Sequence, residues 1–285
     1  MAETTTKADN GTFLTAVSGG DQLTVKKDTL TYLYKLTETV LKSKEENDYL
    51  SICEPLVYLA LEYKKTNETE DLGFDITAIT INFLERLNGK SVQLFNGGKV
   101  EEAAKVIARA MDLIGEKNLK SLIPNETILS EKKILIYNNV SCIFRMQGKL
   151  QLALKVLNST LELEEKLAES EIGGSEISVI GTFLNKSAIL SEMKQYDSAI
   201  EAVNKGLSYI KKVEEKPSLS PEQKKHLKEL YTLNYYSLAV EYEHKNDKEK
   251  SLQYYEESLK YAKETNKVDM IKKIEKALAY IKEKK

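Results

Sequence analysis

A spacing of small and large residues that recurs four times restricts the possible folds of this chain more than any other feature. The clearest copy has Tyr137 at its start, Gly148 near its centre and Ala153 in its second half. The other copies share the pattern and start at Leu87, Phe183 and Tyr235. Small residues are needed where two helices cross closely, and large apolar residues fill the space between successive helix pairs. The sequence therefore predicts an all-α chain of stacked helical hairpins.

The pattern resembles the tetratricopeptide repeat. In the clearest copy, Tyr137 takes the large aromatic position of the first helix, Gly148 takes the turn, and Ala153 takes the small position of the second helix. The resemblance covers residues 80–265 well and residues 26–75 more loosely. It implies a right-handed α-solenoid that binds proteins or extended peptides.

The copies are longer than the usual repeat of this family. Their small second-helix residues, Ala103, Ala153, Ala199 and Ser251, lie 50, 46 and 52 residues apart, whereas the common form repeats about every 34 residues. Each hairpin must therefore have longer helices or longer connections. Extended repeats of this kind resemble those of kinesin light chains and related adaptors, and the tyrosine-rich sequence also resembles some ciliary repeat proteins.

Signals at helix ends divide the chain into four parts. These are a flexible N-terminal tail over residues 1–25, a divergent helical hairpin over 26–75, four extended hairpins over 76–265 and a C-terminal capping helix over 266–285. The strongest helix start is at Ser220, which precedes a proline and forms a capping box with Gln223. We also expect Asp28 to cap the first helix and the glycine pair at 173–174 to end another.

Composition agrees with a helix-rich protein, since 30% of residues are charged and 41% hydrophobic, with 13 glycines and 4 prolines. A formal net charge of −2 creates no global field for nucleic acid or an anionic membrane, so neither is an expected partner. No segment resembles a signal peptide or a membrane span, and Cys53 and Cys142 have the pattern of small core residues. We expect a reducing compartment, namely the cytoplasm, with the cytoskeleton or a cilium as more specific sites.

No residue pattern predicts catalysis, a metal site or a cofactor. The two histidines, His226 and His244, lack companions at metal-ligand spacing. The Gly-Gly-Lys at 97–99 lacks the full spacing of a phosphate-binding loop and falls at an expected helix turn. Adjacent carboxylates such as Glu164 and Glu165 point in different directions on a helix, so they do not make an acid–base pair. We expect no enzyme activity.

Tyrosines are concentrated near the C-terminus, where they could either stack on bases or pack a core. The cluster consists of Tyr231, Tyr235, Tyr236, Tyr242, Tyr254, Tyr255 and Tyr261. Base stacking is usually combined with a positively charged groove, and no basic surplus accompanies this cluster. Core packing is therefore the favoured interpretation.

A partner-binding site is predicted on the inner wall that the first helices of such hairpins form. In the resembled family, an asparagine early in the first helix often hydrogen-bonds an extended peptide, because an amide can both donate and accept. The candidate groove residues are Asn138, Asn139, Arg145, Asn185 and Tyr236. The asparagines could instead satisfy polar groups between helices, and the sequence leaves both roles open.

These features predict a non-catalytic protein interaction scaffold. Two alternatives remain, namely a structural subunit of a large cytoskeletal or ciliary assembly and a regulator whose groove senses a short peptide. The expected partner is a protein or an extended peptide in each case.

Overall fold

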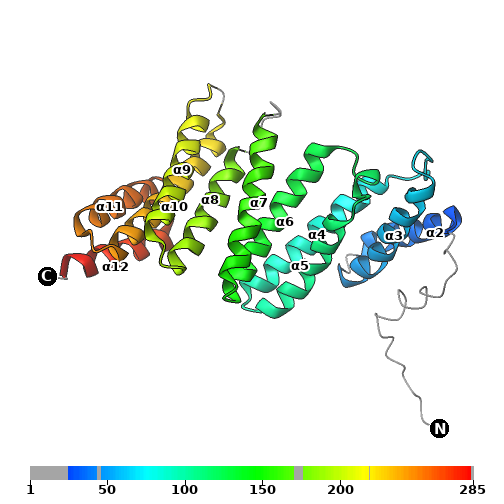
Figure 1. Cartoon of the computed structure of the whole chain (residues 1–285), viewed down its shortest axis with the longest axis horizontal. Helices are drawn as coiled ribbons and strands as arrows, with labels where there is room; N and C mark the ends of the chain where they lie inside the picture. Colours follow the sequence, from blue (N-terminus) through cyan, green and yellow to red (C-terminus); the bar gives the residue numbers. More distant parts are fainter. Residues whose placement is uncertain (1–24, 44–45, 170–175, 218, 284–285) are drawn as a thin grey trace, which may run out of the picture. The chain divides into compact units, whose positions relative to one another are not determined.

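The computed structural model describes residues 25–43, 46–169, 176–217 and 219–283. Within these ranges the chain is all-α, as predicted, with eleven α-helices, one short 3₁₀ helix and no β-strand (Figure 1). The chain divides into two compact units, residues 1–83 and 84–285, and helix α4 runs across the boundary.

The first unit contains a helical hairpin formed by α2 (Lys27–Ser43) and α3 (Glu46–Thr66). Cys53 is buried between the two helices, where its sulfur lies 3.9 Å from the Thr37 hydroxyl. The expected N-cap at Asp28 is wrong, because α2 already begins at Lys27 and Asp28 lies in its first turn. Its negative charge there still favours the positive end of the helix dipole.

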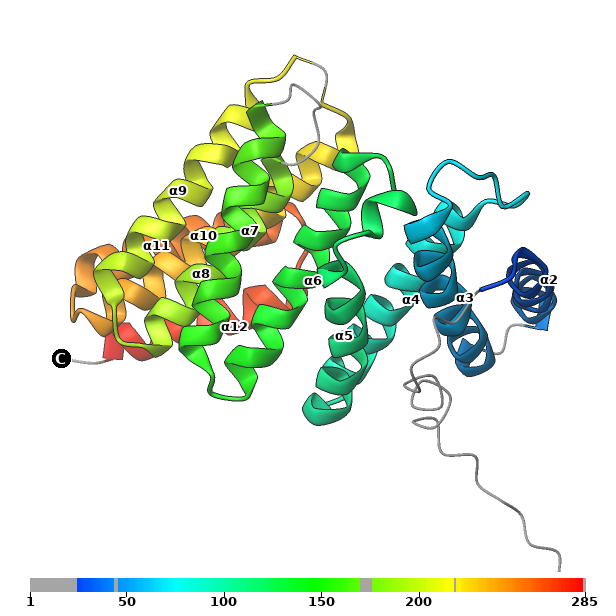
Figure 2. The ribbon, with the colours of Figure 1, turned by 45° about the vertical axis from the view of Figure 1, so that its right-hand side comes forward.

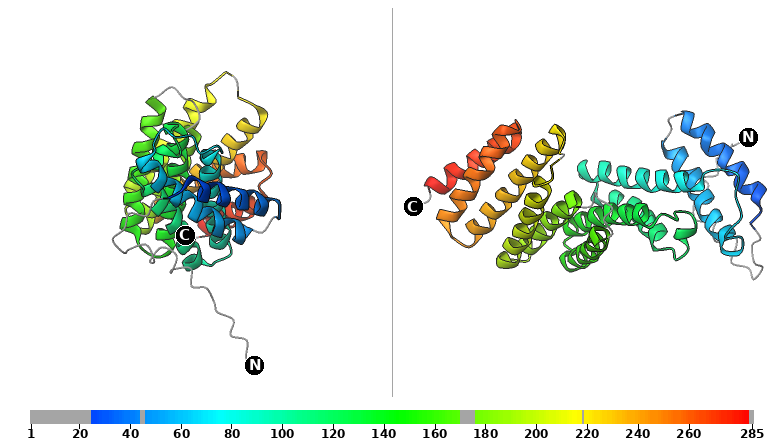
Figure 3. Two further views of the ribbon diagram at one scale, coloured as in Figure 1. Left: turned by 90° about the vertical axis from the view of Figure 1, so that its right-hand side faces the viewer. Right: turned by 90° about the horizontal axis from the view of Figure 1, so that it is seen from above.

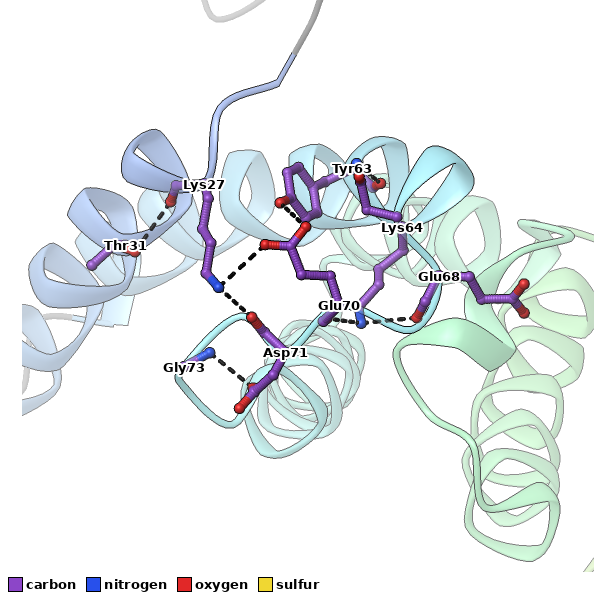
Figure 4. Close-up of polar contacts among 9 residues, drawn as sticks. Lys27, Thr31, Tyr63, Lys64, Glu68, Glu70, Asp71 and Gly73 are labelled. Carbon is purple, nitrogen blue, oxygen red and sulfur yellow. Dashed lines mark hydrogen bonds and ion pairs between the residues drawn. The ribbon is translucent and has the colours of Figure 1, made fainter.

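Charged and polar side chains fix the loop after α3 to both helices of this unit (Figure 4). The ammonium of Lys27 forms an ion pair with Glu70 at 3.3 Å and donates a hydrogen bond to the Asp71 carbonyl. From α3, Tyr63 donates to the other oxygen of Glu70 at 2.6 Å. The Tyr63 hydrogen bond and the Lys27 charge together lower the pKa of Glu70 below its usual value.

The second unit consists of consecutive hairpins, which the right-hand view of Figure 3 shows in chain order. They are α4 (Ile76–Asn96) with α5 (Val100–Gly115), α6 (Glu126–Met146) with α7 (Leu150–Glu169), α8 (Glu176–Glu192) with α9 (Tyr196–Glu214), and α10 (Pro221–His244) with α11 (Lys248–Glu264). We call the first helix of each pair its A helix and the second its B helix. Successive pairs contact one another, so the unit is the predicted helical-repeat solenoid.

A final helix, α12 (Val268–Glu283), packs against α11. Its apolar stripe of Ile274, Leu278 and Ile281 is buried in a cluster with Ala239 and Tyr255 of the last hairpin.

Each hairpin contains one close crossing of its two helices, and a serine faces an alanine there. The pairs are Ser91 with Ala103, Ser141 with Ala153, Ser187 with Ala199, and Ala239 with Ser251, and all eight residues are buried. In the first pair the Ser91 hydroxyl donates to the Ala103 carbonyl at 3.0 Å, and in the last the Ser251 hydroxyl donates to the Ala239 carbonyl at 2.9 Å. The predicted small positions are therefore confirmed. In the first and last hairpins the serine also bonds the facing helix, whereas the Ser141 hydroxyl donates to the Asn138 carbonyl of its own helix.

The turns between A and B helices have one backbone conformation in all four hairpins. A residue with positive φ occupies the same repeat position each time, namely Gly98 (77°), Gly148 (72°), Lys194 (60°) and Asn246 (57°). Glycine adopts this conformation without strain, and asparagine tolerates it. The sequence predicted the turn from glycine in two copies, and the structure shows that the later copies keep it without glycine.

The helix start predicted at Ser220 is confirmed. The Ser220 hydroxyl accepts from the Gln223 N–H at 3.2 Å, and the Ser220 N–H donates to the Gln223 side chain at 2.9 Å, which completes the capping box. The glycine pair at 173–174 lies outside the described residues.

Candidate functional site

The A helices α6, α8 and α10 follow one another in direct contact and form one wall of the second unit (Figure 2). Residues three or four positions apart on one helix share a face, so Leu135, Asn138 and Arg145 lie on one stripe of α6. We call this surface the A-helix wall. It contains four of the five residues of the predicted groove, namely Asn138, Asn139, Arg145 and Asn185.

The predicted asparagines form side-chain pairs between consecutive A helices, one of them with Asn88, which was not predicted. The Asn139 amide donates to the Asn88 side-chain oxygen at 2.6 Å, and the Asn185 amide donates to the Asn138 side-chain oxygen at 3.1 Å. Both pairs join the same two repeat positions, and we call them the asparagine rungs. Between α8 and α10 the two rung positions hold Leu184 and Ser237. Because a leucine side chain cannot hydrogen-bond, these two helices have no rung at this position.

Arg145 makes a further link two helical turns along the same face. Its Nε donates to Glu192 of α8 at 2.7 Å, which joins the A helices of the second and third hairpins. Tyr236 lies elsewhere, because its ring packs edge-on against Tyr255 at 5.5 Å and under the ammonium of Lys273 at 4.4 Å. The structure thus brings four of the five predicted residues into contacts between hairpins and places the fifth against α11 and α12.

Contacts at the A–B turns have the same repeat register. Gln147 donates to Glu101 at 3.1 Å, and Lys245 forms an ion pair with Asp197 at the equivalent positions two hairpins later. Each contact runs from a turn to the start of the preceding B helix. Polar side chains therefore fix the register of the stack at two levels.

The geometry fits the second role that the sequence left open, in which the asparagines satisfy polar groups between helices. A contact with a partner stays a prediction. A side-chain amide carries two N–H groups. Asn139 and Asn185 each use one of them in a rung, so the second could donate to a partner.

A buried carboxyl group that sequence reasoning missed is connected to the asparagine rungs. Glu164 of α7 is fully buried, and one of its oxygens accepts from the hydroxyls of Ser178 at 2.6 Å and Thr182 at 3.0 Å. The Thr182 hydroxyl in turn accepts from the Asn138 amide at 2.9 Å. The second oxygen of Glu164 has no hydrogen-bond partner among the described residues.

Burial raises the pKa of Glu164 to about 7, although the two hydroxyl bonds oppose the shift. The repeat alignment offered a signal for this site. The equivalent positions in the other copies hold Ile114, Ile210 and Ala262, all of which are buried. A glutamate at a core position of one copy is therefore visible in the sequence once the copies are aligned.

Two exposed leucines on the wall were also missed. Leu135 on α6 is 43% exposed and Leu233 on α10 is 42% exposed, and they occupy the same repeat position. Gly181 takes this position on α8, between them, and a Cβ atom built there would meet nothing within 4 Å. Apolar side chains thus flank an open space on the wall.

Residues considered for other chemistry occupy ordinary structural positions. His244 stacks on Tyr196 at 5.0 Å, and His226 lies 4.0 Å from Glu229. Cys142 is only partly buried, which differs from the expected core position, and burial raises the pKa of its thiol. Across the described ranges, no three side chains of the histidine, cysteine, aspartate and glutamate types gather as a metal site.

A search of the described helices finds none with the length and apolarity required to cross a membrane.

The tyrosine cluster packs as predicted. Tyr255 is buried, while Tyr235 and Tyr242 are partly buried against the core of the third and fourth hairpins. Their rings stack with those of neighbouring tyrosines.

Comparison with known proteins gives likenesses among solved structures but none to a family model or a curated protein. Among solved structures, the chain is similar to one in the crystal structure of the APC/C hetero-tetramer Cut9–Hcn1, with 16% sequence identity and a TM-score of 0.37. The match covers 86% of this chain, which spans 46% of the length of the other. Since so low a similarity carries no argument, the assignment to an all-α helical-repeat fold rests on the helix pairs of this chain itself.

Proposed function

We propose that the chain is a non-catalytic protein interaction scaffold whose partner binds along the A-helix wall. The observation that supports this proposal is the series of polar links between consecutive A helices, above all the asparagine rungs. These links hold the helices in register, so the wall is a preorganised surface. Preorganisation reduces the conformational entropy that is lost on binding.

Exposed apolar side chains would supply most of the affinity. Leu135 and Leu233 stand at one repeat position with an open space at Gly181 between them. Apolar side chains that insert into a recess are the usual energetic centre of an interface. The rung amides would add hydrogen bonds and thereby set the register of an extended partner segment.

Affinity purification from the native source, followed by identification of the bound proteins, tests this proposal. The wall variant carries Leu135→Asp and Leu233→Asp, and both sites are exposed enough for the fold to tolerate charge. The matched control is Leu152→Asp, because Leu152 is 50% exposed but lies on a B helix. We expect the wall variant to lose its partner and the control to retain it.

Retention of the same partner by the folded wall variant would contradict the proposal and would place binding on another surface. This design separates binding from stability better than replacing Asn139 and Asn185, because those changes also remove the rungs. Circular dichroism and urea unfolding of each variant establish that the fold is intact.

A further inference from the structure

A cleft of about 250 Å³ opens among α7, α8 and α9. Its apolar lining includes Phe183 and Leu190 of α8 and Ala202 of α9, all of which are buried. Its rim carries Lys186 of α8 and Lys205 of α9. We call this feature the open cleft.

The two lysines outnumber the one acidic lining residue, Glu201, so the rim of the open cleft carries a net positive charge. Lys186 is half-buried and donates to the Asn158 side-chain oxygen at 2.9 Å. Burial lowers the pKa of Lys186, and the nearby charge of Lys205 lowers it further, against the opposing effect of Glu201 and Glu165. Lys205 is paired with Glu201 at 3.1 Å on the exposed surface. A negative group in the open cleft would favour the charged form of Lys186.

The equivalent place in the next hairpin is filled by tyrosines. In repeat register, Phe183 corresponds to Tyr235, Leu190 to Tyr242, Ala202 to Tyr254 and Lys186 to Leu238. The Tyr254 ring stacks with Tyr242 at 5.4 Å and with Tyr235 at 6.1 Å, and all three pack against the core that contains Leu238. We call this filled place the tyrosine groove.

The open cleft has two aromatic rings fewer than the tyrosine groove, at Leu190 and at Ala202, and the ring missing at Ala202 is the one that would lie between its neighbours. The tyrosine groove places Tyr254 between two rings, whereas the open cleft has only the methyl group of Ala202 at that position. A cavity of roughly 150 Å³ is enough for benzene, so the open cleft can hold a substituted ring. It is smaller than the roughly 300–1,000 Å³ of most small-molecule sites, which favours a single side chain.

The charges indicate what should accompany that ring. On α8 and α9, the four polar lining positions of the open cleft hold Lys186, Ser198, Glu201 and Lys205, and the tyrosine groove has Leu238, Lys250, Gln253 and Glu257 at these positions. Two lysines and one glutamate give the open cleft a net charge of +1, whereas the charges of Lys250 and Glu257 cancel in the tyrosine groove. The occupant of the open cleft should therefore bring a negative charge that faces Lys186, because Lys205 already pairs with Glu201.

We propose that the open cleft binds an aromatic side chain of a partner protein segment, with an acidic group beside the ring that faces Lys186. This inference rests on the proposed scaffold function and adds a second contact to it, away from the A-helix wall. The ring would stack on Phe183 and Leu190, as the Tyr254 ring packs on the equivalent tyrosines.

Nuclear magnetic resonance titrations with three small probes test the proposal without the partner. The probes are 3-(4-hydroxyphenyl)propionate, 4-ethylphenol and tyramine, which present the same phenol ring beside a negative, a neutral and a positive group. We expect the anion to bind about fivefold more tightly than the neutral probe, as for a partly exposed ion pair, and the cation to bind most weakly. The shifts should concentrate on the methyl groups of Leu190 and Ala202.

Three variants give the controls. Lys186→Leu should remove the preference for the anion but keep ring binding, whereas Lys90→Leu removes a lysine at the same repeat position of α4 and should change nothing. Ala202→Tyr should abolish the binding of all three probes by filling the open cleft. Equal binding of the three probes by the unchanged protein, or unaltered binding by Ala202→Tyr, would overturn the proposal. Either result would leave the partner test of the A-helix wall unaffected.

Discussion

The open cleft and the tyrosine groove occupy equivalent positions in neighbouring hairpins and differ in what fills them. Around the tyrosine groove, Tyr254 stacks between Tyr235 and Tyr242. Around the open cleft, Ala202 takes the place of Tyr254 and a cleft of about 250 Å³ remains. The two places share the same repeat backbone. The side chain at one position, Tyr254 or Ala202, therefore decides whether the space between the helices is filled by a ring or left as a cleft.

The same two regions differ in their interior and on the A-helix wall. Glu164 lies behind the open cleft at the core position that Ile210 takes behind the tyrosine groove. An asparagine rung joins the A helices beside the open cleft, where Leu184 and Ser237 take the matching positions beside the tyrosine groove. The region of α6 to α9 thus combines polar links with an open surface, whereas the region of α8 to α11 is packed with aromatic rings.

The largest expected change in the free energy of unfolding comes from replacing Glu164, behind the open cleft, with the isoleucine found behind the tyrosine groove. Because burial raises the pKa of Glu164 from 4.5 to about 7, ionisation opposes folding. The contribution of Glu164 to the free energy of unfolding should be fully present below pH 4.5 and should be lost as the pH rises from 4.5 through 7, by about 3 kcal/mol. Glu164→Ile, which copies Ile210, should remove this loss, and urea unfolding at pH 5 and pH 8 measures it.

The control for Glu164 is Glu162→Gln on the exposed face of the same helix, which should leave the pH dependence unchanged. An equal pH dependence in Glu164→Ile and the unchanged protein would show that Glu164 is not the titrating group.

The next largest effect is expected from opening the tyrosine groove. Tyr254→Ala removes the ring between Tyr235 and Tyr242 and should lower the free energy of unfolding by about 2 kcal/mol, less than for a fully buried aromatic residue because Tyr254 is half-buried. Urea unfolding at pH 7 measures the loss. A change below about 0.5 kcal/mol, the level of an ordinary surface substitution, would mean that the stacked rings do not seal this interface.

Loss of a rung should have a smaller effect. Asn185→Ala leaves the side-chain oxygen of Asn138 without its donor, which should cost about 1 kcal/mol. The matched control is Ser237→Ala, because Leu184 at the facing position cannot hydrogen-bond. Amide hydrogen exchange along α6 and α8 would show where the loosening occurs, and equal losses in both variants would contradict a specific role for the rung.

The helix pairs and their crossings could be predicted because they depend on residues close in sequence. The capping box at Ser220 and the serine–alanine crossings follow from local spacing alone. The rungs could not be predicted, because each joins two residues that do not align in the repeat. Asn185, for example, aligns with Asn139 but bonds to Asn138, one residue earlier. That offset is set by how hairpins stack, so the sequence left both roles of the asparagines open and did not identify α8 and α4 as the helices that Asn138 and Asn139 contact.

The open cleft could not be recognised from the sequence for a related reason. Lys186 and Ala202 are ordinary helix residues in isolation, and only the comparison with Leu238 and Tyr254 shows that a ring is missing. Glu164 was considered only as one of two adjacent carboxylates, and its burial depends on α8 covering α7.

The smallest expected change in the free energy of unfolding comes from filling the open cleft, which would make it like the tyrosine groove. Ala202→Tyr gives α9 the residue that α11 has at Tyr254, and a filled cavity typically adds about 0.5 kcal/mol or more to the free energy of unfolding. The gain should stay small because Lys186 remains where the tyrosine groove has Leu238, so one face of the new ring meets a cation rather than an apolar side chain. Combining Ala202→Tyr with Lys186→Leu should raise the gain beyond the sum of the two single changes, since the residues line the same cleft. A double-mutant cycle by urea unfolding measures this coupling, and additive effects would show that the open cleft and the tyrosine groove are not interchangeable.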